Sequence, residues 1–207
     1  MTDTLSKKTG SVFIVDDDTS FLRSVSRLLT AVGYSVESFG SAQDFFARPS
    51  PERPGCVVAD VQMPGIDGLQ LQEALRRSAN PLPVIFLTGQ GDIPTSVSAM
   101  RKGAEDFLTK RAPRDELLAA VERALERDGR ERQLRQRQRE LSGRLAELSV
   151  REKEVLSHVV RGKMNKEIAA DLNINLRTVK LHRTNITRKL NVQSVAELTR
   201  LVDETGL

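Results

Sequence analysis

The sequence predicts an α/β domain built on a five-stranded parallel sheet, followed by a charged helical segment and a small all-helical domain. Over the first 126 residues, short apolar runs alternate with amphipathic helical patterns, an order typical of a parallel sheet covered by helices. Residues 149–204 show helix-start signals and no strand pattern. Charge divides in the same way: residues 1–124 carry 14 Lys or Arg against 16 Asp or Glu, and residues 125–207 carry 18 against 12. The basic second part indicates a surface for a polyanion.

Five βα units account for the first part of the chain. Each apolar run ends at a polar residue, and turn signals such as Gly33 and Gly103 separate successive elements. Asp18 is expected to cap the helix that follows the first strand. The strands are expected at residues 12–16, 34–38, 56–60, 83–88 and 105–109, and the helices at residues 20–32, 41–47, 68–78, 94–102 and 114–126.

Residues 127–148 are rich in Gln, Arg and Glu and are expected to form a charged helical linker. Leu134, Leu141 and Leu148 recur every seven residues, but two heptads do not establish a coiled coil. A solvated helix is therefore the favoured interpretation, and a contribution to dimer contacts is the alternative.

The last part of the chain, residues 149–207, is expected to be a compact domain of four short helices. Serine and glutamate at capping-box spacing satisfy free backbone amides at a helix start, and asparagine does so alone. The signals are the pairs Ser149 with Glu152 and Ser194 with Glu197, the N-cap residues Asn165 and Asn175, and the helix stop Gly162.

Composition excludes several classes of protein. Residues 1–11 lack the apolar core of a secretory signal and are expected to be a flexible N-terminus. No apolar run reaches membrane-spanning length, so we expect a cytoplasmic protein without a membrane partner. The single cysteine, Cys56, cannot form an internal disulfide or a multi-thiolate metal site, and its place beside a strand favours a buried structural thiol.

Polar side chains stand where four of the predicted strands end. Asp16 and Asp17 follow the first strand, Asp60 and Thr88 close the third and fourth, and Lys110 follows the fifth. Because the carboxyl ends of parallel strands meet at one edge of the sheet, these groups are expected to converge. Carboxylates there can hold Mg²⁺, and one of them can attack a phosphorus atom while the hydroxyl and ammonium balance the added charge. The pattern predicts a phosphoryl-transfer site.

Four segments at these strand ends resemble the receiver domains of two-component response regulators, and the resemblance covers about the first 125 residues. It implies a flavodoxin-like sheet with strand order 2-1-3-4-5, and a phosphoryl group accepted by Asp60 from a histidine kinase. The segments are residues 15–17 (Val-Asp-Asp), 58–68 (Val-Ala-Asp-Val-Gln-Met-Pro-Gly-Ile-Asp-Gly), 86–89 (Phe-Leu-Thr-Gly) and 103–110 (Gly-Ala-Glu-Asp-Phe-Leu-Thr-Lys).

The same resemblance implies a metal site. Asp17, Asp60 and the backbone carbonyl of Gln62 would ligate Mg²⁺, or Mn²⁺ in its place, and Asp16 would act through a water molecule. All of these are oxygen ligands, the kind that hard divalent cations prefer.

It further implies that Thr88 and Lys110 contact the phosphoryl group, and that Phe107 is a switch aromatic that turns inward when Thr88 moves. An ordinary core phenylalanine is the alternative for Phe107. The chain departs from the family pattern at Arg111, because receivers usually have proline after the lysine, often through a cis peptide bond. The bond before Arg111 is expected to be trans, since a cis bond to a residue other than proline costs about 2.5–4 kcal/mol.

The basic part of the chain contains a helix, a turn and a second helix. Residues 163–190 carry seven Lys or Arg against two acidic residues. Val179, Ile186 and Leu190 keep helical spacing and are expected to pack inward, which leaves basic, hydroxyl and amide side chains outside. A charge run is usually a solvated face, but this alternation favours a helix-turn-helix whose second helix enters the major groove of DNA.

Residues 148–152 (Leu-Ser-Val-Arg-Glu), 165–169 (Asn-Lys-Glu-Ile-Ala) and 177–183 (Arg-Thr-Val-Lys-Leu-His-Arg) resemble the LuxR/FixJ/NarL class of DNA-binding domains. The resemblance implies base contacts by Lys180, Leu181 and Thr184. For His182, packing at the edge of the domain is the alternative to a phosphate contact. The residues that would hold DNA phosphates are Lys166, Arg177, Thr178, His182, Arg183 and Arg188.

As a whole, the chain resembles FixJ-type two-component transcription factors, with a pattern most similar to regulators of styrene and toluene degradation. This implies that a cognate sensor histidine kinase phosphorylates Asp60, and that phosphorylation controls sequence-specific binding to double-stranded promoter DNA and transcription. A homodimer formed on activation and RNA polymerase are further implied partners. The protein would not be a classical enzyme, although the receiver would catalyse its own phosphorylation and dephosphorylation.

Two alternatives stay open on sequence alone. One is a phosphohydrolase of the haloacid-dehalogenase type, with Asp16 as nucleophile and Asp18 as acid; the late acidic pair and the cap of such enzymes are missing. The other is a constitutive DNA-binding protein whose receiver takes no phosphate, for which the Lys110-Arg111 pair is the only support.

Overall fold

The computed structural model describes residues 10–48, 54–89 and 93–205. The chain divides into two compact units, Met1–Arg132 and Gln133–Leu207. Most of the predicted flexible N-terminus, residues 1–11, lies outside the described residues. Across the described ranges, no helix combines the length and the apolar character that crossing a bilayer requires.

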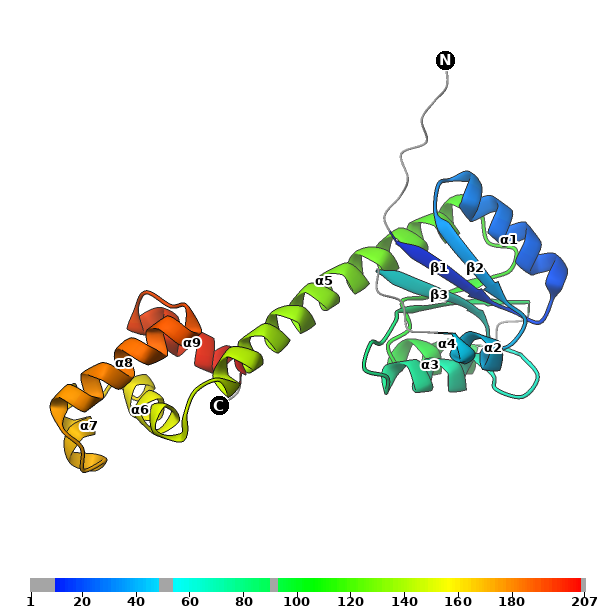
Figure 1. Ribbon diagram of the computed structural model, residues 1–207. Helices are drawn as coiled ribbons and strands as arrows, with labels where there is room; N and C mark the ends of the chain where they lie inside the picture. Colours follow the sequence, from blue (N-terminus) through cyan, green and yellow to red (C-terminus); the bar gives the residue numbers. More distant parts are fainter. Residues whose placement is uncertain (1–9, 49–53, 90–92, 206–207) are drawn as a thin grey trace, which may run out of the picture. The chain divides into compact units, whose positions relative to one another are not determined.

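The N-terminal unit is built on a five-stranded parallel sheet (Figure 1). Its strands are β1 (Ser11–Val15), β2 (Ser35–Phe39), β3 (Gly55–Asp60), β4 (Val84–Thr88) and β5 (Asp106–Thr109). Their order, β2-β1-β3-β4-β5, confirms the predicted fold. Because β1 and β3 are neighbours, Val15 lies in register with Ala59, so both strands end at the same edge of the sheet.

Helices cover both faces of this sheet (Figure 1). Alternate residues of each strand face opposite sides. Val12 and Ile14 therefore pack with α1 and α5, and Phe13 and Val15 pack with the helices of the other face. Cys56 is fully buried, as predicted, and burial raises the pKa of its thiol. The helices are α1 (Thr19–Ala31), α2 (Ala42–Ala47), α3 (Gly68–Arg76), α4 (Ile93–Arg101) and α5 (Arg114–Ala146).

The fifth helix does not end near residue 126 as predicted but continues without a break into the segment predicted as a helical linker. Helix α5 runs through Gly129 as far as Ala146. A buried carboxylate stabilises this extension, because Asp128 Oδ2 accepts hydrogen bonds from the Gly55 backbone amide at 2.8 Å and from Arg132 Nε at 2.6 Å. The contact joins residues 73 positions apart, so no local sequence pattern reveals it.

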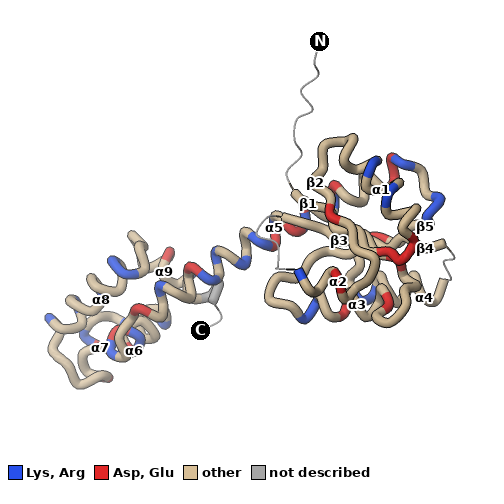
Figure 2. The backbone as a smooth tube through the Cα atoms, turned by 45° about the vertical axis from the view of Figure 1, so that its right-hand side comes forward, with Lys and Arg blue, Asp and Glu red and all other residues tan. Residues whose placement is uncertain are grey.

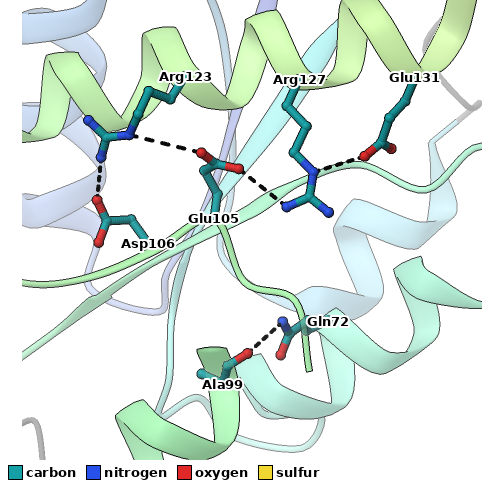
Figure 3. A network of polar contacts seen from close by, with 7 residues as sticks. All are labelled: Gln72, Ala99, Glu105, Asp106, Arg123, Arg127 and Glu131. Carbon is teal, nitrogen blue, oxygen red and sulfur yellow. Dashed lines mark hydrogen bonds and ion pairs between the residues drawn. The ribbon is translucent and has the colours of Figure 1, made fainter. Parts of the chain in front are cut away.

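Two arginines of α5 form ion pairs with the start of β5 (Figure 3). Arg123 Nη2 lies 2.6 Å from Asp106 Oδ2, and Arg127 Nη1 lies 3.3 Å from Glu105 Oε2. Asp106 also accepts a hydrogen bond from the backbone amide of Phe107, at 2.8 Å. Helix α5 is thus in direct contact with the strand that carries the predicted switch aromatic.

The C-terminal unit is all-helical, as predicted. Ser149 and Glu152 form the expected capping box, with reciprocal hydrogen bonds of 3.2 and 2.8 Å. The second box is only half formed: Ser194 accepts from the Glu197 amide, but the Glu197 carboxylate accepts from the Gln193 amide instead of the Ser194 amide. The helices are α6 (Val150–Val160), α7 (Asn165–Asp171), α8 (Leu176–Leu190) and α9 (Val195–Thr205), and the last turns of α5 join them.

Asn175 caps α8 as predicted, with its side chain accepting from the Arg177 amide at 2.8 Å. Gly162 follows α6 with a φ of 78°, as expected of a helix stop. The prediction for Asn165 is wrong, because this residue is the first of α7 and Met164 holds the N-cap position. The Glu167 carboxylate accepts from the Met164 amide at 2.7 Å, so a glutamate rather than an asparagine satisfies this helix start.

Candidate functional site

Two carboxylates and one ammonium meet at the carboxyl ends of the central strands. Asp16 follows β1, Asp60 closes β3 and Lys110 follows β5. Lys110 Nζ lies 2.7 Å from Asp16 Oδ2 and 2.8 Å from Asp60 Oδ2, so one cation bridges both acids. The parallel strands bring together residues that are 94 positions apart in the sequence.

Both acids of these ion pairs are buried. Asp16 is only 1% exposed and Asp60 only 8%. Burial raises the pKa of the Asp16 carboxyl, and the hydrogen bond with Lys110 opposes this only in part. For Lys110, burial would lower the pKa, but hydrogen bonds to Asp16 and Asp60 outweigh it and the pKa is raised. The lysine is therefore held in its charged form.

Asp17 completes an acidic cluster that is compatible with a divalent metal ion. One carboxylate oxygen from each of Asp16, Asp17 and Asp60 lies within 4.8 Å of the other two. Asp17 is exposed, and Gln62 is exposed next to the cluster, where its amide donates to Asp60 Oδ1 at 3.2 Å. Three hard oxygen donors with an open side fit the few carboxylates plus water that Mg²⁺ prefers.

The remaining predicted receiver residues lie on β4 and β5. Thr88 is the last residue of β4 and is buried, and its carbonyl accepts a hydrogen bond from the Lys110 amide at 2.8 Å. Asp60 is in register with Leu87, so Thr88 lies one residue beyond it on the neighbouring strand. Phe107 is half-buried on β5 and packs against Phe86, with ring centroids 5.9 Å apart.

Asp18 confirms its predicted role as the N-cap of α1. Its Oδ1 accepts hydrogen bonds from the amides of Ser20 at 2.8 Å and Phe21 at 3.2 Å. The Phe21 amide is the main cause of a lowered Asp18 pKa, so the side chain is held as an acceptor. This disfavours Asp18 as the acid of a phosphohydrolase, because a general acid must carry a proton.

The sequence did not indicate the role of Phe21, whose ring faces the lysine of the site. Lys110 Nζ lies 4.5 Å from the centroid of this ring. The peptide bond before Arg111 is trans, since the described residues contain no cis peptide. The structure thus places an aromatic ring beside Lys110, in a chain that lacks proline after that lysine.

The second predicted site is the outer face of α8. Val179, Ile186 and Leu190 are buried, as their spacing predicted, and Lys180, Leu181 and Thr184 are exposed. Leu181 is 59% exposed on this outer face. Figure 2 shows Lys and Arg recurring along the second half of α5 and through α7 and α8. Of the residues predicted to contact phosphates, Lys166, Arg177 and Arg188 are exposed, and Thr178, His182 and Arg183 are half-buried.

Hydrogen bonds within the unit engage part of this basic set. Arg183 Nη1 donates to Asn165 Oδ1 at 2.8 Å, which ties the start of α7 to α8. Lys189 Nζ lies 2.7 Å from the buried Glu152 carboxylate, so this lysine stabilises α6 and is not part of the outer face. His182 Nδ1 is buried and makes no hydrogen bond within the described residues. For this nitrogen, packing at the edge of the domain is therefore favoured over a phosphate contact.

Two family models match the chain at these two sites. Residues 12–122 match the response regulator receiver domain, and residues 146–202 match the luxR family of bacterial regulatory proteins. The response regulator protein TodT of Pseudomonas putida is 40% identical over 199 residues, covering 96% of this chain and 88% of TodT. The transcriptional regulatory protein FixJ of Bradyrhizobium diazoefficiens is 35% identical, covering 96% of this chain and 97% of FixJ.

A solved structure extends the comparison. The low-resolution structure of the response regulator StyR is 43% identical to the chain with a TM-score of 0.86, and it covers 95% of this chain and 100% of StyR. A receiver sheet with an acidic cluster, followed by a luxR-type helical unit, defines a response regulator that controls transcription. The chain belongs to the response regulator family, in the group with a luxR-type DNA-binding domain that includes FixJ and TodT.

Proposed function

We propose that Asp60 accepts a phosphoryl group from a cognate sensor histidine kinase, and that this modification controls promoter binding and transcription. One observation carries the proposal: the Asp60 carboxylate closes β3 beside two further acids and lies 2.8 Å from the Lys110 ammonium. In our assignment, residues 12–126 form the receiver, residues 127–148 the linker and residues 149–207 the DNA-binding domain.

In the proposed reaction, an Asp60 carboxylate oxygen attacks the phosphorus of a phosphohistidine. The P–N bond breaks, its electron pair stays with the imidazole nitrogen, which takes up a proton, and an acyl phosphate forms. Lys110 balances the charge of the transferred group, and the Thr88 hydroxyl donates a hydrogen bond to one of its oxygens. Phe107 follows Thr88 inward, which shifts the receiver towards its active conformation.

Asp17, Asp60 and the Gln62 carbonyl would hold Mg²⁺ or Mn²⁺, with Asp16 acting through water. When bound, this ion neutralises part of the negative charge on the phosphoryl oxygens. In this proposal, the receiver catalyses its own phosphorylation from small phosphodonors and its own dephosphorylation. The fit rests on the three carboxylates, whose oxygens lie within 4.8 Å of one another.

DNA recognition is assigned to the outer face of α8. Lys180, Leu181 and Thr184 read bases because they are exposed beside the buried stripe of the helix. A homodimer of the phosphorylated chain binds paired half-sites in cytoplasmic promoter DNA, where RNA polymerase is the next partner. The residues that hold phosphates are Lys166, Arg177, Thr178, His182, Arg183 and Arg188.

Mass spectrometry of acid-labile phosphate tests the receiver chemistry. The full chain is incubated with acetyl phosphate and Mg²⁺, and the modified residue is mapped. Label at Asp60 is the expected result, and Asp60→Asn removes it. Label at Asp16 instead points to a phosphohydrolase intermediate, and no label with any donor points to a constitutive DNA-binding protein.

A binding assay tests the link to DNA. Fragments selected from random DNA by the phosphorylated wild type are titrated with wild type, Asp60→Asn and Asp44→Asn, the last being an exposed acid of α2 outside the acidic cluster. Phosphodonor is expected to strengthen binding of wild type and Asp44→Asn only. Stimulated binding by Asp60→Asn would show that this carboxylate does not carry the signal.

A further inference from the structure

Lys110 sits between two kinds of partner. On one side, its ammonium contacts the Asp16 and Asp60 carboxylates at 2.7 and 2.8 Å. On the other, the ring of Phe21 lies 4.5 Å from the nitrogen. The face of an aromatic ring is negative and attracts a cation within about 6 Å of the centroid, more strongly where water is excluded. Lys110 is only 18% exposed, so this attraction is little screened.

The backbone of Phe21 is held by the same turn that positions Asp16. The Phe21 amide donates to Asp18 Oδ1 at 3.2 Å, and the Asp18 amide donates to Asp16 Oδ1 at 2.9 Å. Phe21 also packs against the core on the α1 side of the sheet. The β1–α1 turn therefore sets the positions of a carboxylate and of a ring relative to one another, with the ammonium between them.

The lysine itself has few backbone constraints. Its amide donates to the Thr88 carbonyl at 2.8 Å, and Arg111 follows through a trans peptide bond rather than the proline typical of receivers. Beyond that amide, a lysine side chain is a flexible four-carbon stem with a point charge at its end. A fixed ring beside the stem limits the positions that the charge can occupy.

We propose that Phe21 is a positioning residue that holds the Lys110 ammonium against the phosphoacceptor carboxylate. This inference rests on the proposed function for its consequence in phosphoryl transfer, but the contact between ring and ammonium can be measured without it. The ring acts through Lys110, whose nitrogen lies 4.5 Å from its centroid, by keeping the cation where charge develops during transfer.

A spectroscopic experiment tests the contact in the unphosphorylated full-length protein. Protons on the ε-carbon of Lys110, assigned with Lys110→Arg, are expected to resonate upfield, because this carbon is bonded to the nitrogen that lies over the Phe21 ring. Phe21→Leu, which keeps apolar volume without a ring, should return them to the shift of exposed lysines. Phe21→Tyr should keep the upfield shift. An unshifted resonance in the wild type would overturn the proposal.

A double-mutant cycle tests the consequence, using phosphoramidate as the donor. Phe21→Leu is expected to lower the phosphorylation rate constant roughly 3- to 10-fold and Phe21→Tyr by less than about 2-fold. In a Lys110→Met background, Phe21→Leu should change nothing further, because no cation remains to be positioned. An equal loss in both backgrounds would show that the ring is only part of the core, and would refute positioning.

The two possible failures are distinguishable. If Lys110→Met is phosphorylated at the wild-type rate, the proposed role of Lys110 is wrong, and the chemical shift alone decides whether the ring holds the ammonium. If Lys110→Met is slow and Phe21→Leu is not, the proposed function stands and the role of Phe21 is refuted. Thermal unfolding of each variant separates both outcomes from loss of fold.

Discussion

Replacing Asp128 with alanine removes the carboxylate that ties the extension of α5 to the start of β3. Asp128 is fully buried, and its Oδ2 is the acceptor for both the Gly55 amide and Arg132 Nε. The variant leaves a buried backbone N–H without this partner and separates a guanidinium, only 17% exposed, from its counter-charge. No neighbouring acceptor is gained in exchange.

The expected loss of stability follows from these two contacts. An unsatisfied buried N–H costs about 1–3 kcal/mol. Breaking a buried ion pair costs about 3–5 kcal/mol, and the partial water access of Arg132 puts this pair at the lower end. Since the two terms share one carboxylate, we expect a total of about 3–5 kcal/mol. Asp128→Asn keeps an acceptor of similar shape, so its cost should be about 1–2 kcal/mol.

Urea unfolding, monitored by tyrosine fluorescence, measures this loss of stability in the N-terminal unit alone. Tyr34 is the single tyrosine of a chain without tryptophan, and it is buried in the core between α1 and the sheet. Glu126→Ala is a matched control, because its ion pair with Arg130 is exposed and is worth only about 0.3–0.5 kcal/mol. A loss below about 1 kcal/mol in Asp128→Ala would show that the hydrogen bonds of Asp128 with Gly55 and Arg132 do not stabilise the N-terminal unit.

Three further predictions concern other parts of the chain. Gly68→Ala would place a methyl group 2.2 Å from the Asp60 carbonyl oxygen, so we expect more than about 2 kcal/mol of destabilisation by the same urea assay. The pKa of Glu152 is lowered, chiefly by its hydrogen bond from Lys189. Its stabilisation is therefore present above the usual carboxyl value of about 4.3 and is lost as pH falls below it. The protection factors of the α6 amides, which correct for the slower intrinsic exchange at low pH, should therefore fall on acidification in the wild type, and less so in Glu152→Gln. Lys180→Ala should weaken specific DNA binding by about 1–3 kcal/mol in fluorescence anisotropy, and equal losses on selected and scrambled fragments would contradict a base contact.

The sequence alone predicts the parallel sheet, because each strand has its own run of apolar residues. Apolar runs of β-branched residues ended at Asp60 and Thr88 as expected, and a parallel sheet has one edge for all such ends. The same reasoning predicts that Lys110, which follows the fifth strand, lies close to Asp60 and Thr88. Similarly, the inward spacing of Val179 and Ile186 was enough to define the outer face of α8.

No local sequence pattern predicts the contacts between segments that are distant in the chain. Gly129 looks like a break in a helical pattern, whereas the hydrogen bond between Asp128 and Gly55 holds α5 to the start of β3 at this point. The ring of Phe21 reads as an ordinary apolar position of α1, since nothing local indicates that a lysine 89 positions later lies over it. The residue type of Asn165 predicts an N-cap, but the Glu167 carboxylate accepts the hydrogen bond from the Met164 amide at that helix start.

The leucines at the end of α5 bear on how this chain can be divided and recombined. Leu141, Leu145 and Leu148 belong to the hydrophobic core of the C-terminal unit, although they precede its first capping box at Ser149. A fragment expressed from residue 149 would leave that core without three of its side chains, whereas one expressed from Gln133 retains them. A gene fusion that exchanges receivers is therefore best joined upstream of Leu141, where a crossover transfers the helical unit with its core intact.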